Sequence, residues 1–250
     1  MPNSIEKAML ILRTLSDTPT TPVTLAEIAE RTGISKSTAA HIIKTLTQGR
    51  YIRRISHSAG YTVGPELYYL TRYGRYEEDI IAVCHPLLRY LSKMTGGTAI
   101  FVVLRDGEKY IIDRADGNFH YPDDSAKLIK DDVYRTGTGR YILSFMREDQ
   151  ALAQFEQLGV PEKKDWPEGT DRESFLAERN RIRGIPYIHL TNRQLDAISV
   201  PVTAGDLVGS IGLVIRHDGE HPALNAAQIE KIGSLMIRVR REAERRLRFT

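Results

Sequence analysis

The sequence predicts an α+β protein with a small N-terminal helical domain that ends in a β-hairpin and a larger domain built on an antiparallel sheet. The chain has 250 residues, enough for one large domain or two ordinary ones. Gly64 and Pro65 interrupt the regular patterns and mark a boundary. Beyond them most predicted strands belong to hairpins, and helices precede, separate and follow them. We therefore expect domains at residues 1–65 and 78–250, joined by a linker helix at residues 66–77.

The composition is that of an ordinary folded protein in a reducing compartment. Hydrophobic residues make up 41% and charged residues 27%, which excludes a disordered or fibrous chain. The single cysteine, Cys84, excludes an intramolecular disulfide framework and a multi-cysteine zinc or iron–sulfur site. The sequence shows neither an apolar run long enough for a membrane span nor a secretory signal. We expect a soluble, cytoplasmic protein with no membrane partner.

The first predicted helix covers residues 4–15. Its apolar side chains fall on one helical face and are expected to point inward: Ile5, Ala8, Met9, Leu12 and Leu15. Two prolines and three threonines within residues 17–22 predict the loop that ends this helix.

Two more helices follow, with a short turn between them. Thr24 and Glu27 have the spacing of a capping box, so a helix begins there and continues through Arg31. Gly33 can adopt the left-handed conformation that ends this helix, and Ser35 is a suitable cap for a third helix that reaches about residue 48. Their apolar residues share an inner face: Ile28, Ala29, Ile34, Ala39, Ile42, Ile43 and Leu46. This is the pattern of a helix-turn-helix.

The outer face of the third helix consists of small hydrogen-bond donors and cations. Such side chains can approach phosphates and base edges in a major groove about 12 Å wide. The residues expected to contact DNA there are Ser35, Lys36, Ser37, Thr38, His41, Lys44 and Gln48. The alternative is a helical hairpin that only packs, with its charges solvated.

A basic hairpin comes next. Residues 51–55 and 60–63 read as two short strands, with the turn at residues 56–60. A basic hairpin directly after a recognition helix is the wing of a winged helix. Its side chains expected to contact backbone phosphate or the minor groove are Arg53, Arg54 and His57.

The charge distribution agrees with a nucleic-acid partner for the first third of the chain. The net charge of the whole chain is +3. Residues 1–75 contain ten basic and five acidic side chains, a net +5, whereas the remaining 175 residues carry 25 basic and 27 acidic ones, a net −2. A basic segment on a mildly acidic remainder indicates an anionic partner for that segment. An uneven but solvated surface is the other interpretation.

The second domain begins after a linker helix rich in aromatic residues. We expect this linker, at residues 66–75, to be buried against the second domain or another subunit. Helices are predicted at residues 80–94, 139–145, 148–157, 172–183 and 225–247, and strands at residues 98–104, 109–114, 185–190, 196–203 and 207–216.

Several segments resemble the IclR family of bacterial transcription regulators, and together they extend over nearly the whole chain. Residues 24–39, Thr-Leu-Ala-Glu-Ile-Ala-Glu-Arg-Thr-Gly-Ile-Ser-Lys-Ser-Thr-Ala, are similar to the family's helix-turn-helix. Further similarities lie at the end of the wing (residues 60–65), the helix after the linker (85–87), the start of the pocket helix (136–140) and a pocket strand (198–202).

The resemblance implies a winged helix joined to a GAF-like sensor domain. It also implies operator binding by dimers or pairs of dimers, and small metabolites, often organic acids, as effectors. Ala40 and His41 stand where the family commonly has His-Arg, so its base preference does not transfer. Ala197 replaces a frequent cysteine, and Gly212 and Val214 replace small hydroxyl residues, so a less polar pocket is expected.

The expected effector anchor is the segment Thr136, Gly137, Thr138 and Gly139, which precedes a predicted helix. Backbone N–H groups at a helix start, unobstructed by side chains, can bind a carboxylate. The alternative is an ordinary turn with an N-cap. Arg114 either pairs with an acidic effector or forms a surface salt bridge. By resemblance, Asp196 and Ser199 belong to the pocket strand, although Ser199 can equally face the core.

The sequence does not predict catalytic residues, metal ligands or a cofactor. It contains no Gly-x-Ser-x-Gly elbow, no Walker loop and no strand-following Gly-x-Gly-x-x-Gly. Cys84 lies in an apolar helical pattern and is interpreted as a structural thiol. The histidine-containing segment at residues 217–221 is interpreted as a solvated loop. The arginine run at residues 238–248 is interpreted as a solvated helix face.

These observations favour a DNA-binding transcription regulator, with a repressor as the expected type. Its partners would be a double-stranded operator, a small-molecule effector and further copies of the chain. Two alternatives from other classes are a small-molecule enzyme with an accessory winged helix and a protein–protein module that uses the winged helix as a scaffold.

Overall fold

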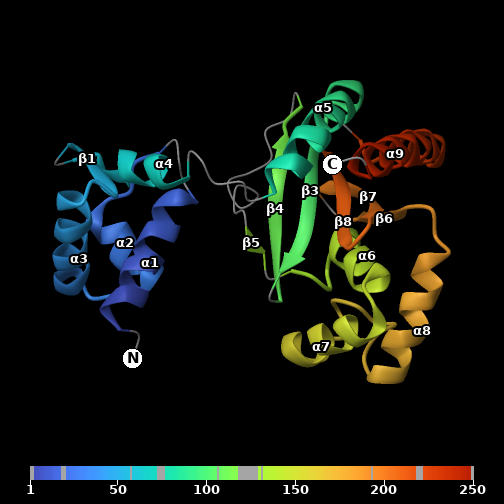
Figure 1. Cartoon of the computed structure of the whole chain (residues 1–250), viewed down its shortest axis with the longest axis horizontal. Coiled ribbons are helices and arrows are strands. Elements are labelled where there is room, and N and C mark those ends of the chain that lie inside the picture. The colour runs from blue at the N-terminus through green and yellow to red at the C-terminus, as the bar shows by residue number, and fades with distance from the viewer. Residues whose placement is uncertain are drawn as a thin grey trace. The chain divides into compact units, whose positions relative to one another are not determined.

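The computed structural model describes residues 3–17, 21–56, 58–71, 77–105, 107–117, 129–130, 132–192, 194–217 and 222–248. The chain forms two compact units (Figure 1). The N-terminal unit is Met1–Tyr76, and the C-terminal unit contains Glu77–Pro122 and Leu128–Thr250. Each unit is described by itself below.

The N-terminal unit contains four helices and a two-stranded antiparallel hairpin within the described residues. They are α1 (Ser4–Ser16), α2 (Leu25–Thr32), α3 (Lys36–Gln48), β1 (Ile52–Ser56), β2 (Gly60–Val63) and α4 (Pro65–Thr71). Caps determine where the helices begin and end. Thr24 and Glu27 form the expected capping box at α2, and Gly33 follows that helix with a left-handed φ of +67°. The winged helix-turn-helix prediction is therefore confirmed.

The core of this unit is small and apolar. Its buried members are Ile11, Leu15, Val23, Ile28, Ile34, Ala39, Ile43 and Ile52. The expected inward face of α1 was wrong, because Ile5 and Met9 are 66% and 64% exposed. Residues 8, 11, 12 and 15 satisfy the same helical spacing as the predicted set, and α1 is rotated so that Ile11 and Leu15 are buried.

The aromatic side chains of the linker helix α4 are not covered by the N-terminal unit to which this helix belongs. Tyr68, Tyr69 and Leu70 are 74%, 54% and 58% exposed. Their burial against the second domain or against another subunit remains a prediction. None of the helices in the described part of the chain is both long enough and apolar enough to span a membrane.

The C-terminal unit is built on a six-stranded antiparallel sheet with the order β5-β4-β3-β8-β7-β6. The strands are β3 (Thr98–Arg105), β4 (Glu108–Ala115), β5 (Ile129–Lys130), β6 (Ile188–Thr191), β7 (Leu195–Ala204) and β8 (Leu207–Arg216). The helices are α5 (Glu78–Thr95), α6 (Gly137–Phe145), α7 (Glu148–Leu158), α8 (Arg172–Arg183) and α9 (Ala226–Leu247). The expected α+β class with an antiparallel sheet is confirmed.

Helices cover both faces of this sheet. Residues of α5 and α9 share one apolar cluster with Phe101 of β3 and Val200 of β7. Residues of α6, α7 and α8 share a second cluster with Val102 of β3 and Ile111 of β4. Figure 1 shows α5 and α9 near one another, with α6, α7 and α8 farther down. The sheet therefore separates two hydrophobic layers.

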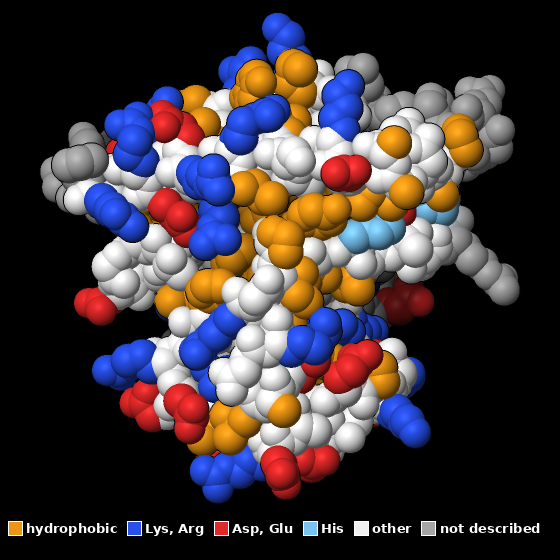
Figure 2. All heavy atoms as spheres, turned by 90° about the vertical axis from the view of Figure 1, so that its right-hand side faces the viewer, with side chains coloured by type: hydrophobic (Ala, Val, Ile, Leu, Met, Phe, Trp, Pro, Cys, Tyr) orange, Lys and Arg blue, Asp and Glu red, His pale blue; other side chains and the backbone are white. Residues whose placement is uncertain are grey.

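The outer face of the C-terminal unit mixes charge types. Figure 2 shows basic and acidic side chains around a band of apolar ones. On α9, Arg238, Arg241 and Arg245 are exposed. Glu242 accepts hydrogen bonds from Arg245 and Arg246, and these bonds lower the pKa of its carboxyl group to about 2. Part of the basic charge of α9 is thus balanced along the helix itself.

Candidate nucleic-acid interface and sensor site

The helix α3 presents the face that the sequence predicts for DNA contact. Its exposed members are Lys36, Ser37, His41, Lys44 and Gln48, together with the cap residue Ser35, whereas Thr38 is half-buried. On the opposite face, Ala39 and Ile43 are buried in the core of the unit. This division leaves the polar face available to a partner.

Three hydroxyl groups gather at the N-terminus of α3. The Ser35 hydroxyl accepts a hydrogen bond from the Thr38 backbone N–H at 3.3 Å and donates one to Thr38 Oγ1 at 2.9 Å. It also lies 3.2 Å from the Ser37 hydroxyl. A helix N-terminus carries partial positive charge and favours a phosphate nearby. These hydroxyl groups and the Lys36 ammonium therefore suit a contact with a nucleic-acid backbone.

The hairpin that follows α3 in the sequence carries two exposed arginines. Arg53 is paired with Thr62, and Arg54 with Tyr61, across the two strands. The Arg54 guanidinium lies over the Tyr61 ring, 5.6 Å from its centroid, which restrains the side chain. His57, the third predicted contact of the wing, lies outside the described residues.

In the C-terminal unit, the expected effector anchor is the first turn of α6. Thr136 is the N-cap, and its hydroxyl accepts a hydrogen bond from the Gly139 N–H at 3.3 Å. The N–H groups of Gly137 and Thr138 have no hydrogen-bond acceptor within the part of the chain that the structure describes. The segment thus has an ordinary side-chain N-cap and also two backbone N–H donors that remain at the start of the helix.

Small residues let this turn approach the sheet. A Cβ atom on Gly137 would lie 2.9 Å from the Ser199 hydroxyl of β7. A Cβ atom on Gly212 of β8 would lie 2.8 Å from the Thr138 methyl group. The structure therefore brings Thr136, Gly137, Thr138 and Gly139 together with Ser199, and Gly212 provides the space beneath Thr138.

Lys109 is a buried cation at this site that the sequence reasoning missed. Its side chain is 3% exposed, forms an ion pair with Asp132 and donates a hydrogen bond to Thr136 Oγ1 at 2.9 Å. The period of two along β4 was the available signal, because it places Lys109 on the same inward face as Ile111. Asp132 balances this ammonium, and the helix N-terminus beside it contributes partial positive charge.

The other end of α6 is fixed by two arginines of α8. Arg179 donates hydrogen bonds to the carbonyl groups of Leu143 and Met146, both at 2.8 Å. Arg183 donates one to the Ser144 carbonyl at 2.6 Å. These cations satisfy carbonyl groups that a helix C-terminus leaves without partners and oppose its partial negative charge.

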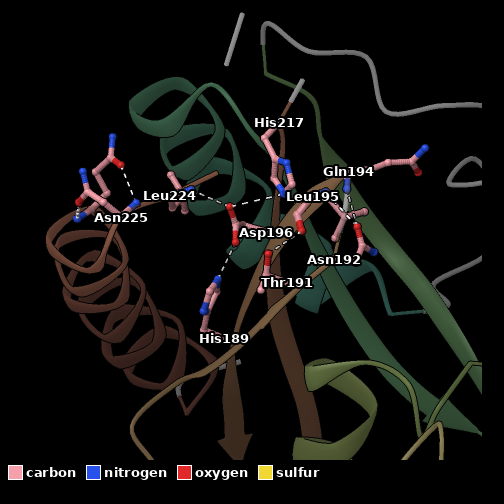
Figure 3. A network of polar contacts seen from close by, with 10 residues as sticks. His189, Thr191, Asn192, Gln194, Leu195, Asp196, His217, Leu224 and Asn225 are labelled. Carbon is pink, nitrogen blue, oxygen red and sulfur yellow. Dashed lines mark hydrogen bonds and ion pairs between the residues drawn. The ribbon is translucent and has the colours of Figure 1, made fainter. Parts of the chain in front are cut away.

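Two predicted site residues have other partners. Arg114 bonds Asp116 through Nε at 2.7 Å and through a terminal nitrogen at 2.6 Å. Asp196 belongs to a network that joins β6, β7 and the start of α9 (Figure 3). It lies 2.7 Å from His189 Nε2 and accepts a hydrogen bond from the Leu224 N–H at 2.8 Å.

The Asp196 carboxylate is held in its charged form. Burial by itself would raise its pKa, but hydrogen bonds from Leu224, His189 and Thr191 outweigh burial and lower it. His217 Nε2 lies 3.9 Å from the same carboxylate. Within the described residues these side chains do not form a group that could hold a metal ion. The arrangement joins the sheet to α9.

Cys84 has the surroundings of a structural thiol. It is buried in α5, and burial, with the nearby Asp113 carboxylate, raises the pKa of the thiol to about 12. A thiol with such a pKa is a poor nucleophile at neutral pH.

Comparisons with known proteins agree with this geometry. The IclR helix-turn-helix domain matches residues 4–56. The transcriptional repressor IclR of Escherichia coli is 26% identical over 141 residues, which are 55% of this chain and 51% of that protein. The chain thus spans about half the length of the curated relatives it matches.

Solved structures extend the likeness to the whole fold. An IclR transcriptional regulator from Alicyclobacillus acidocaldarius has a TM-score of 0.69 at 20% identity, with 99% of each chain covered. An IclR homologue from Microbacterium hydrocarbonoxydans, complexed with 4-hydroxybenzoate, has a TM-score of 0.69 at 16% identity, with 99% of this chain and 100% of that chain covered. The IclR helix-turn-helix model thus matches the first three helices and the first wing strand, and the fold of the chain is similar to that of solved IclR-type regulators.

Proposed function

We propose that this protein is a sequence-specific DNA-binding transcription regulator of the IclR type whose operator binding responds to a small-molecule effector. The observation that carries the proposal is the exposed face of α3, with its hydroxyl groups and cations, inside the matched helix-turn-helix. Two copies of the chain would place two recognition helices in successive major grooves, with the wings on the backbone. The repressor from Escherichia coli supports repression as the outcome.

Effector binding is the second part of the proposal. The first turn of α6 supplies two backbone donors and the partial positive charge of a helix N-terminus, and Lys109 places a buried ammonium, paired with Asp132, beside them. An organic acid suits this chemistry, and the solved homologue that holds 4-hydroxybenzoate supports it. An effector changes operator binding only if its affinity differs between two arrangements of the protein.

A mobility shift tests DNA binding. The wild type and Lys44→Ala would be compared on the DNA upstream of the protein's own gene, over a range of salt concentrations. We expect the wild type to shift a fragment, and its affinity to fall steeply with salt because phosphate contacts release counterions. Lys44→Ala should bind more weakly with a smaller salt slope, whereas Lys163→Ala, in the other unit, should behave like the wild type.

The absence of a mobility shift would favour a different function. If the wild type shifts no fragment at low salt, the DNA-binding proposal fails. Salt-insensitive binding of a protein partner would then favour the protein–protein module.

A thermal-shift series tests the sensor site. Small carboxylates, including 4-hydroxybenzoate, would be added to the wild type and to Lys109→Gln. We expect at least one acid to raise the melting temperature of the wild type, because a bound ligand stabilises the folded state by RT ln(1 + [L]/Kd), and to raise the melting temperature of the variant by less. If every acid raised the melting temperature of Lys109→Gln by as much as that of the wild type, the result would count against the α6 anchor.

A further inference from the structure

A hollow of about 320 Å³ lies between α7 and the ends of β3 and β8. It is distinct from the first turn of α6, and Met146, which follows the last turn of that helix, forms part of its wall. Leu104 and Val208 supply apolar surface from the sheet. Its volume is within the range of small-molecule sites, which begins at about 300 Å³.

The wall that α7 contributes consists of two glutamines and Ala153. Gln150, Gln154 and Gln157 follow one another at helical spacing, and the first two line the hollow. Two other apolar residues of α7, Ala151 and Phe155, are buried in the core instead. The helix therefore presents amide groups to a hollow whose floor is apolar.

One of these amide groups has an unused acceptor. The Oε1 atom of Gln154 is buried and has no hydrogen-bond partner within the described ranges of the chain. A buried acceptor without a donor is costly, and it identifies a place where an incoming hydroxyl or N–H group would gain a hydrogen bond.

The charges around the hollow favour a neutral ligand. The Arg105 guanidinium is already bonded to Glu77 Oε1 at 2.7 Å and to the Leu104 carbonyl at 3.1 Å. Asp206, on the β7–β8 turn, adds a carboxylate to the lining. Because Arg105 is balanced by Glu77, the carboxylate of Asp206 disfavours an anion, whereas hydroxyl groups can donate to Asp206 and to Gln154.

We propose that this hollow binds a small neutral polyhydroxylated molecule, such as a monosaccharide or polyol. One hydroxyl group donates to Gln154 Oε1 and a second donates to Asp206. The carbon skeleton lies on Leu104 and Val208. The proposal does not depend on the effector anchor, because the two places are at opposite ends of α6, roughly 14 Å apart at 1.5 Å per residue.

The side-chain amide signals of Gln154 provide the test. Full-length protein labelled with ¹⁵N would be titrated with glucose, ribose and glycerol, with sodium gluconate as the matched anion. The Gln154 signals would be assigned by their loss in Gln154→Leu. We expect saturable shifts of these signals with at least one neutral probe and weaker binding of gluconate.

Melting temperatures complete the experiment. Gln154→Leu removes the unused acceptor, so we expect this variant to be at least as stable as the wild type and to lose the stabilisation by the neutral probe. Gln194→Leu, an exposed position on another loop, should retain that stabilisation. The proposal is overturned if no neutral probe shifts the Gln154 signals, as expected for water alone, or if Gln154→Leu keeps the full stabilisation. A failed mobility shift would leave this result unaffected.

Discussion

Single glycines determine how closely α6 approaches its neighbours. Gly139 is the clearest case, because a Cβ atom there would overlap the backbone carbonyl group of Val133. A backbone neighbour cannot rotate away as a flexible side chain can. The close approach therefore requires glycine at this position, whatever else the segment binds.

We predict that Gly139→Ala destabilises the C-terminal unit by about 2–4 kcal/mol, as overpacked buried positions do. Gly184→Ala is the matched control, since its Cβ atom would lie 3.4 Å from the nearest atom, the Arg181 carbonyl oxygen, at a φ of −82°. That change should be neutral or slightly stabilising. Urea unfolding measures both, and equal midpoints for the two variants would contradict the prediction.

Asp196 makes the stability of the unit depend on acid. Its pKa is lowered in the folded protein, so its stabilising contribution is complete above the ordinary carboxyl pKa of about 4 and is lost as the pH falls through the lower folded value. Melting temperatures measured from neutral to acidic pH should therefore fall less steeply for Asp196→Asn than for the wild type. At neutral pH the variant should be the less stable of the two.

The control for this pH dependence is Asp149→Asn, because Asp149 is 72% exposed in its pair with Arg147. It should follow the wild-type curve. Parallel curves for Asp196→Asn and the wild type would mean that the network in Figure 3 does not carry the acid sensitivity.

At the scale of elements, local signals predicted most helix ends. Thr24 and Ser35 form the expected caps, and α2 and α3 begin directly after them. Caps act over three or four residues, so one sequence contains all the information that they need. The predicted bounds of α8, at residues 172–183, agree with the structure for the same reason: Asp171 caps it.

The bounds of the strands, which depend on distant neighbours in the sequence, were predicted less accurately than the helix ends. The two-residue strand β5 was not predicted, and the strand expected at residues 185–190 is β6, Ile188–Thr191. The N–H of Ile185 bonds Ile182 in the turn after α8, which delays the strand. Strand pairing depends on segments far apart in the chain, and the local hydrophobic periodicity does not show which segments pair.

In the candidate sensor site, too, features set by neighbouring residues were predicted and contacts between distant segments were not. The first turn of α6 was predicted from a local Gly-x-Gly pattern, whereas Ser199 was assigned to the pocket strand only through resemblance, and its contact with this turn was not predicted. The ion pair between Lys109 and Asp132 was not predicted, because it joins β4 to a segment 23 positions later in the chain. The partners of Asp196 on β6 and before α9 were equally beyond local pattern.

For the whole molecule, the important feature is that hydrophobic cores are built separately. The N-terminal unit has its own cluster, and the C-terminal unit has one cluster on each face of its sheet. The basic excess of the chain also lies within the first 75 residues. The boundary between the two sets of hydrophobic cores thus coincides with the boundary between the basic and the mildly acidic parts of the chain.

We predict two unfolding transitions in calorimetry. Ile28→Ala creates a cavity at a fully buried position and should destabilise the N-terminal unit by about 2–5 kcal/mol, so that only one transition moves. Ile55→Ala, at a position that is 43% exposed, should move neither by much. A single transition that shifts as a whole with Ile28→Ala would show that the units unfold together.

The arginine bonds at the end of α6 restrict how a signal can leave the sensor site. Because Arg179 and Arg183 of α8 hold the three carbonyl groups, sliding α6 along its axis would break four charge-assisted bonds at once. Motion started at the Thr136 end is therefore directed into the chain that precedes the helix, where Asp132 and Lys109 meet. The two ends of α6 are therefore held differently: cations of α8 hold its C-terminal end, whereas the ion pair of Lys109 and Asp132 links its N-terminal end to β4.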